Sequence, residues 1–117
     1  MHIYNRTRQT TLATAARRAQ SYKTRLLGLM FQNHLPEGEA LLLEPESSIH
    51  TFFMRFPIDV LYLDKSYSVL RADPAMPPNR IGPLVTRGCH AVLELPPGTI
   101  AATQTEVGDQ LSLVSEA

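Results

Sequence analysis

One short block of the sequence combines aromatic, apolar and charged residues closely enough to form a ligand site. Phe53, Met54 and Arg55 are consecutive. The arginine would pair with an anionic group of a ligand, and the two neighbouring side chains would contact its apolar part. The block therefore predicts a site for a ligand that is partly anionic and partly apolar, with packing of these side chains into the core and against the 74–88 loop as the alternative.

Two acidic residues, Asp59 and Glu94, are each flanked by apolar residues in segments with the pattern of strands. A carboxylate is costly to bury unless it receives hydrogen bonds or faces a cation. For Asp59 the candidate partners are Arg55, Arg87 and backbone N–H groups at the break before Pro57. We expect it mainly to cap that backbone, with ligand binding as the alternative. Strand alternation allows Glu94 to face solvent, and a structural role is its alternative.

The histidines and the single cysteine form no known metal or nucleophile motif. His2, His34, His50 and His90 occur without Cys-x-x-Cys, His-x-His or His-Glu-x-x-His spacing, and no glycine-rich phosphate loop is present. We therefore expect no metal and no other cofactor. Cys89 and His90 are neighbours in an expected strand, so their side chains would point to opposite faces. Cys89 is interpreted as a small buried hydrophobic residue.

Length and composition predict one domain over residues 1–117. The chain is 44% hydrophobic and 19% charged, with a formal net charge of zero. These values exclude a disordered chain and a strongly basic nucleic-acid binder, so no nucleic acid is expected as a partner. One cysteine excludes an intrachain disulfide, and no apolar run approaches the roughly 20 residues of a membrane span. The N-terminus lacks the apolar stretch of a signal peptide, so a cytoplasmic location is expected.

The zero net charge hides an asymmetry along the chain. Residues 1–38 carry six basic and one acidic side chain, whereas residues 39–117 carry five basic and ten acidic ones. A basic surface attracts phosphate or acidic partners. We expect mainly that the two parts pack together with their charges facing each other. Docking of the basic part onto a larger assembly is the alternative.

The elements that must position these residues are mostly short strands bounded by turn signals. They are expected at residues 2–5, 10–19 (a strand or a weak helix), 40–44, 49–54, 58–64, 67–73, 89–95 and 110–114. Residues 58–64 and 67–73 flank a two-residue connection, which predicts a hairpin. This pattern predicts a mainly β (α+β) fold: a compact curled or barrel-like antiparallel or mixed sheet of six to eight short strands, with one or two short helices.

Turns and loops complete the expected frame. A helix of two turns would begin at Ser21 and end at Gly28 in the left-handed conformation, and a helical turn would be capped by Thr99. Gly98 closes a Pro-Pro-Gly turn in which glycine permits a positive φ. Residues 74–88 form a long loop with four prolines, and loops of this length are often functional.

Three blocks of the sequence resemble one prokaryotic family. They are residues 19–21 with Gly28–Phe31 and Leu35, residues 49–64, and residues 91–98 followed by Gly108-Asp109. Together they cover about residues 10–114 and are similar to the family catalogued as domain of unknown function 192. Met54 and Asp59, at their spacing, are the centre of the most specific block. The resemblance implies a small β-rich domain with no assigned activity. Many members carry Trp where this chain has Phe53, and many are exported.

The sequence as a whole predicts a non-enzymatic domain that binds a peptide, a protein or a small ligand. The site is expected near the Phe53–Asp59 segment and the Pro74–Gly88 loop. The candidate ligand-binding residues are His50, Phe53, Met54, Arg55, Asp59, Arg87 and His90, and the structural residues are Gly28, Pro57, Glu94 and Gly98. No catalytic residue is assigned. One alternative is an enzyme that uses Asp59 with His50 or His90 as base; another is an accessory protein that docks through its basic N-terminal part.

Overall fold

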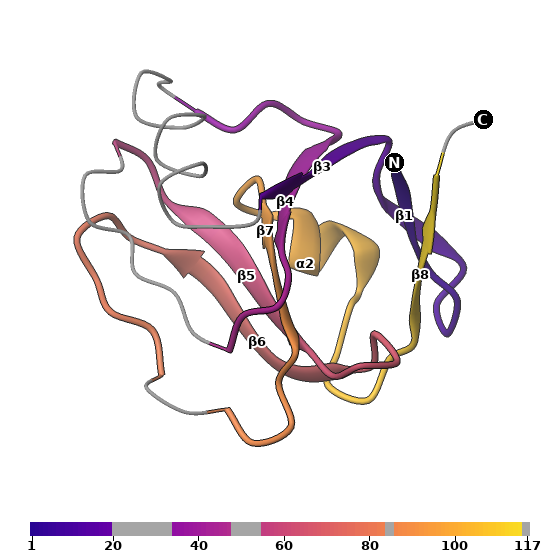
Figure 1. Cartoon of the computed structure of the whole chain (residues 1–117). Helices are drawn as coiled ribbons and strands as arrows, with labels where there is room; N and C mark the ends of the chain where they lie inside the picture. The colour runs from indigo at the N-terminus through magenta and orange to yellow at the C-terminus, as the bar shows by residue number, and fades with distance from the viewer. Residues whose placement is uncertain (20–33, 48–54, 84–85, 116–117) are drawn as a thin grey trace.

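A computed structural model describes residues 1–19, 34–47, 55–83 and 86–115 (Figure 1). These residues form two β-sheets and one short helix, which turns and loops connect. The elements are β1 (His2–Asn5), β2 (Thr10–Ala13), β3 (Ala15–Ala19), β4 (Glu39–Leu43), β5 (Ile58–Leu63), β6 (Val69–Met76), β7 (Ala91–Leu95), α2 (Thr99–Thr103) and β8 (Leu111–Val114). The three-stranded sheet has the order β2-β1-β8, and the five-stranded sheet has the order β3-β4-β7-β5-β6. The sheets do not close into a barrel. The expected mainly β fold is confirmed, and its larger sheet is mixed because β3 and β4 are parallel.

The two sheets are joined where β3 follows the N-terminal hairpin. The Ala16 N–H donates to the Met1 carbonyl at 2.9 Å, and the Met1 ammonium donates to the Ala16 carbonyl at 3.3 Å. Residues 10–19 form two strands rather than one strand or a helix. The chain turns between them at Thr14, whose N–H donates to the Gly38 carbonyl at 2.9 Å.

The predicted hairpin between β5 and β6 is present, and the two strands are antiparallel. Its turn lacks the favoured Asn-Gly pair. The Asp64 side chain stabilises the turn instead, because its Oδ1 accepts the N–H groups of Ser66 and Ser68, each at 2.9 Å. β6 continues to Met76, so the first residues of the expected 74–88 loop belong to a strand.

The outer edge of β6 is irregular. Pro74 has no N–H group to donate, and Ala75 has a φ of 50°, in the left-handed region. The β5–β6 register also shifts between Ile58 and Val60. At the other end of β6, Val69 pairs with the Gly108-Asp109 turn through hydrogen bonds of 2.8 and 2.9 Å.

The core lies on both faces of the five-stranded sheet. Every residue of β5 and of β7 is buried, which explains why each strand is apolar except for one acid, Asp59 or Glu94. One face packs against the three-stranded sheet and α2 through Leu42, Leu61, Leu93, Leu95, Ile3, Ile100 and Leu111. The opposite face carries Leu41, Leu43, Phe56, Ile58, Val60, Tyr62 and Val92. A strand that is buried on two faces has little freedom to move, so β5 and β7 form the rigid centre of the domain.

Some expected elements differ from the fold or fall outside it. β7 begins at Ala91, so Cys89 and His90 precede the strand and alternation does not set their directions. Thr99 does not cap α2, because the N-cap is Gly98. The expected strand at 49–54 and the helix from Ser21 to Gly28 lie outside the described residues.

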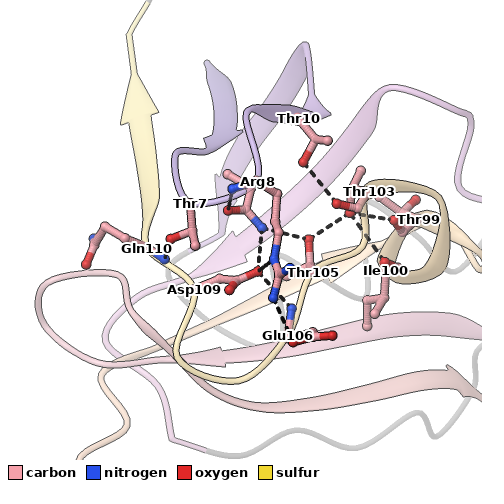
Figure 2. A network of polar contacts seen from close by, with 11 residues as sticks. Thr7, Arg8, Thr10, Thr99, Ile100, Thr103, Thr105, Glu106, Asp109 and Gln110 are labelled. Carbon is pink, nitrogen blue, oxygen red and sulfur yellow. Dashed lines mark hydrogen bonds and ion pairs between the residues drawn. The ribbon is translucent and has the colours of Figure 1, made fainter.

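A buried polar network ties the β1–β2 turn to the segment between α2 and β8 (Figure 2). Asn5 is fully buried, and its Nδ2 donates to Thr105 Oγ1 at 3.1 Å and to Asp109 Oδ2 at 2.9 Å. The same Asp109 oxygen accepts Arg8 Nε at 3.1 Å, while Arg8 Nη2 lies 2.7 Å from Glu106. Residues about a hundred positions apart are therefore held together by one shared carboxylate oxygen.

The ion pairs partly neutralise the basic N-terminal part of the chain. Arg8 pairs with Glu106 and Asp109, and Arg18 pairs with Glu44. These pairs join the basic part to the acidic part, which is the arrangement that the charge asymmetry predicted. Side chains in the stretch 20–33 lie outside the described residues.

We expect the substitution Asp109→Asn to destabilise the protein in a pH-dependent way. Burial opposes ionisation of Asp109, but the hydrogen bonds from Asn5, the Glu106 N–H and Arg8 outweigh it and lower the pKa of the carboxyl. A lowered pKa in the folded state contributes stability that is complete above the ordinary carboxyl pKa of about 4 and is lost as the pH falls through the lowered value. Urea unfolding at pH 7 should therefore show a loss of roughly 1–3 kcal/mol in the variant.

The difference between the Asp109→Asn variant and the wild type should shrink as the pH is lowered below the ordinary carboxyl range. Glu106→Gln is the matched control, because it removes an exposed partner of the same Arg8 and exposed pairs contribute about 0–1 kcal/mol. Equal losses in the two variants, or a difference that grows in acid, would contradict this account of the network.

Candidate functional site

Asp59 lies near the start of β5, and its carboxylate is fully buried. Oδ1 accepts the Ala75 N–H at 2.8 Å, and Oδ2 accepts the N–H groups of Gly98 at 3.1 Å and Ile100 at 2.8 Å. Asp59 therefore caps backbone of β6 and α2, and not the backbone around Pro57. Within the described residues it makes no ion pair with an arginine.

The three amides need this carboxylate because nothing local replaces it. Gly98, the N-cap of α2, has no side chain and has a φ of 95°, the positive value expected for this turn. Thr99 does not act as the cap, since its hydroxyl donates to the Pro96 carbonyl at 2.8 Å. The first N–H groups of a helix have no partner within the helix, and a carboxylate is favoured at that end. The Asp59 side chain, which comes from β5, thus accepts the hydrogen bonds that a local N-cap side chain of α2 would accept.

The position of Asp59 argues against its use as an acid or base together with His90. The His90 N–H donates to the Leu63 carbonyl at 2.8 Å, so His90 lies at the far end of β5. Leu63 is four positions after Asp59 along the strand, which is about 13 Å. The two groups therefore do not share one pocket. His50, the other candidate base, lies outside the described residues.

Glu94 is fully buried in the middle of β7, so its expected exposure to solvent is wrong. It pairs in register with Leu41 of β4 and Val60 of β5. Alternation along β7 places it on the sheet face of Val92. The tyrosine on the same face, Tyr62, is also fully buried. Burial, followed by the nearby charge of Asp73, raises the pKa of Tyr62 above its ordinary value, so its hydroxyl stays protonated.

The two segments expected to form a ligand site meet at one end of the β5–β6 hairpin. Ile58 pairs with Met76, so residues 55–57 and the residues after β6 leave the same end of the sheet. We call this region the β5–β6 end and define it by its exposed side chains, which are Arg55, Pro57, Pro74, Ala75, Pro77, Asn79, Arg80 and Ile81. Ile81 is 60% exposed. Phe53 and Met54 lie outside the described residues.

A second polar group, which the sequence did not indicate, surrounds Glu44. Glu44 Oε2 accepts the Tyr67 hydroxyl at 2.7 Å and lies 3.4 Å from His90 Nε2, while Oε1 pairs with Arg18. A cavity of about 320 Å³ lies beside His90 and is lined by Pro45, Glu46, Ser47, Cys89 and His90. His90, one of the candidate ligand-binding residues, thus belongs to this Glu44 cluster. Arg87, another candidate, is exposed.

The chemistry of Cys89 does not favour nucleophilic catalysis. Its Sγ lies 3.6 Å from the Glu46 carbonyl and 3.4 Å from the Ala91 carbonyl. Burial raises the pKa of the thiol, so the group is a thiol and not a thiolate at neutral pH. Among the residues that the structure describes, no group of three or more His, Cys, Asp or Glu side chains is placed to hold a metal ion. No helix within this part of the chain is long and apolar enough to cross a membrane.

Asp59→Asn should destabilise the protein by roughly 1.5–3 kcal/mol, because an amide cannot accept hydrogen bonds at both of its terminal atoms. One of the three buried N–H groups would then face the amide NH₂. Urea unfolding measures the loss, and amide hydrogen exchange should speed up at Ala75, Gly98 and Ile100. Glu37→Gln is the control, because Glu37 is exposed and surface substitutions usually change stability by about 0.5 kcal/mol or less. Unchanged exchange at all three amides would refute the capping role.

Comparisons with known proteins identify relatives but no activity. The family model DUF192, described as "Uncharacterized ACR", matches residues 3–113. A UPF0127 protein of Thermococcus sibiricus is 29% identical over 113 residues, covering 93% of this chain and 72% of the relative. A UPF0127 protein of Pyrococcus furiosus is 31% identical over 114 residues, covering 93% of this chain and 95% of the relative.

Two solved structures share the fold at low sequence identity. A protein of unknown function from Novosphingobium aromaticivorans aligns with a TM-score of 0.75 and 19% identity, over 96% of this chain and 82% of that one. A structure titled as a putative transcription regulator, from Sinorhizobium meliloti, aligns with a TM-score of 0.76 and 19% identity, over 95% and 89%. On the family match over nearly its whole length, the chain belongs to the uncharacterised prokaryotic family DUF192, whose curated relatives are named UPF0127 proteins.

Proposed function

We propose that this protein is a non-enzymatic binding domain that holds an acidic peptide segment of another protein at the β5–β6 end. The observation that carries the proposal is that two segments without acidic residues, 55–57 and 74–88, leave the sheet at the same end. Their adjacency turns separate stretches of sequence into one candidate surface.

Charge favours an acidic partner. Residues 39–117 hold ten acidic and five basic side chains, yet Arg55, Arg80 and Arg87 all lie in the two acid-free segments. Arg55 and Arg80 belong to the β5–β6 end, whereas Arg87 is three residues before His90 and so lies toward the far end of β5. Complementary charge raises the association rate and selects the partner, and an arginine binds a carboxylate through a planar pair of hydrogen bonds.

The apolar side chains at the β5–β6 end favour a peptide with apolar residues over a simple anion. Pro57, Pro77 and Ile81 are exposed there, and Ile81 is 60% exposed. Proline contributes apolar surface with almost no side-chain entropy to lose on binding. A ligand that alternates acidic and apolar residues would match both properties of this surface.

Asp59 supports the proposal as a positioning residue rather than as a contact. Its Oδ1 holds the Ala75 N–H at 2.8 Å, immediately before the 77–83 stretch. Its other oxygen is used by α2. The strand end from which the loop departs is therefore fixed before any ligand arrives, which lowers the entropic cost of binding.

The alternatives have less support. Asp59 and His90 lie at opposite ends of β5, which weakens the enzyme that would use both. The N-terminal basic part has Arg8 and Arg18 already paired with acids of the same chain, which weakens docking through that part.

Fluorescence anisotropy with two labelled peptides tests the proposal. One peptide alternates Glu with Leu, and the other replaces each Glu by Lys. The wild type should bind the acidic peptide only, and added salt should weaken the complex, because exposed charges are screened. Arg55→Ala and Ile81→Ser should each weaken binding about fivefold to tenfold, as expected for about 1 kcal/mol.

Matched controls test whether binding depends on this surface or on exposed charge and apolar area elsewhere on the molecule. Arg17→Ala removes an exposed arginine from β3, and Val107→Ser removes a side chain that is 63% exposed. Both controls should bind like the wild type. Equal affinity for the Glu and Lys peptides, or equal losses in the controls and the test variants, would rule the proposed function out.

A further inference from the structure

The outer face of the three-stranded sheet has a row of side chains arranged around one exposed aromatic ring. Tyr4 of β1 is directly opposite Thr11 of β2 and Ser112 of β8. Opposed residues on neighbouring strands are close enough for their side chains to act on one ligand. The neighbours of Tyr4 along β1, Ile3 and Asn5, are buried, so alternation directs Tyr4 outward.

The aromatic surface extends beyond Tyr4 to His2. The two rings are stacked, with centroids 5.9 Å apart and planes inclined by 21°. The Tyr4 hydroxyl also lies 3.3 Å from His2 Nδ1. Tyr4 is 37% exposed and Val114, opposite His2, is 49% exposed. The Tyr4 ring and the Val114 side chain are thus partly open to solvent.

The residue that directly follows β1 is an arginine, Arg6. Arg6 is exposed, and its guanidinium makes no ion pair within the described part of the chain. Arg8, two residues later, differs because it is engaged by Glu106 and Asp109. The cation of Arg6 is therefore available to a ligand.

Tyr4, Arg6 and Val114 line an open depression of about 560 Å³. Its lining is Tyr4, Asn5, Arg6, Gln9, Thr10, Thr11, Ser112 and Val114. None of these residues is acidic, and four of them besides Tyr4 and Asn5 end in a hydroxyl or amide. Cavities of roughly 300–1,000 Å³ accommodate small ligands.

We infer that this depression is a binding site for a small planar aromatic ligand that bears a phosphate or carboxylate group. The ring stacks on Tyr4, because aromatic faces attract each other in offset stacks. The anionic group binds Arg6, whose planar guanidinium matches a phosphate or a carboxylate. Thr11, Ser112 and Gln9 donate to and accept from polar groups at the edge of the ring.

The site is independent of the proposed peptide surface. In Figure 1, β1 and β8 lie at the side of the molecule opposite the loop that follows β6. The two sites share no residue, so failure of one proposal leaves the other standing.

NMR titration of the full chain with four probes tests the inference. The probes are adenosine 5′-monophosphate, benzoate, adenosine without phosphate, and inorganic phosphate. At least one of the two aromatic anions should bind more tightly than both adenosine and phosphate, with shifts centred on the amides of Tyr4, Thr11 and Ser112. The stronger of the two aromatic anions identifies the anionic group and ring size that the site prefers.

Variants separate the two contacts. Tyr4→Leu keeps an apolar side chain but removes the ring, and Arg6→Gln removes the charge. Each should weaken the aromatic anion about tenfold, the effect expected of one stacked ring or one ionic hydrogen bond. Tyr4→Phe should bind like the wild type, and so should the control Arg17→Gln on β3.

Three results would overturn the inference. Absence of binding by both aromatic anions excludes the site. Phosphate that binds as tightly as adenosine 5′-monophosphate, with benzoate no tighter than phosphate, removes the role of the ring. Full affinity in Tyr4→Leu and Arg6→Gln, with both variants folded, places the ligand elsewhere.

Discussion

The fold depends on one buried carboxylate and the three backbone N–H groups that it accepts. Asp59 is fully buried, and its oxygens join β5 to the end of β6 and to the start of α2. A charge in such a place is tolerated only because every donor is aimed at it. The arrangement lets a five-residue helix and an irregular strand end keep fixed positions against the central sheet.

Local patterns predicted most of the elements, and contacts between distant segments account for most of the errors. The β5–β6 hairpin, the Pro-Pro-Gly turn and the mainly β class follow from alternation, turn residues and proline placement. The partners of Asp59 did not follow, since α2 begins about forty residues later in the chain. For Glu94 the sequence left solvent exposure and a structural role open, because a single apolar run cannot distinguish one covered face from two. In the fold, β7 is buried on both faces.

The polar groups around Glu44 and around Asn5 and Asp109 illustrate the same limit. Arg18, Tyr67 and His90 meet at Glu44 from separate strands and turns, and no spacing in the sequence relates them. Gly108-Asp109 follows one of the blocks that resemble the family, yet Asn5, which donates a hydrogen bond to Asp109, lies at the other end of the chain. The β5–β6 end is different, because the hairpin that unites its two segments was itself visible in the sequence. That difference explains why a surface near Arg55 was foreseen and the depression beside Tyr4 was not.

The irregular outer edge of β6 also bears on whether copies of the protein can pair edge to edge. A regular outer strand presents a ladder of amide and carbonyl groups that another chain can extend. Here the ladder is interrupted by Pro74 and by the left-handed Ala75, and its beginning is occupied by the Gly108-Asp109 turn. The larger sheet thus presents no uninterrupted ladder at this edge for another chain to extend.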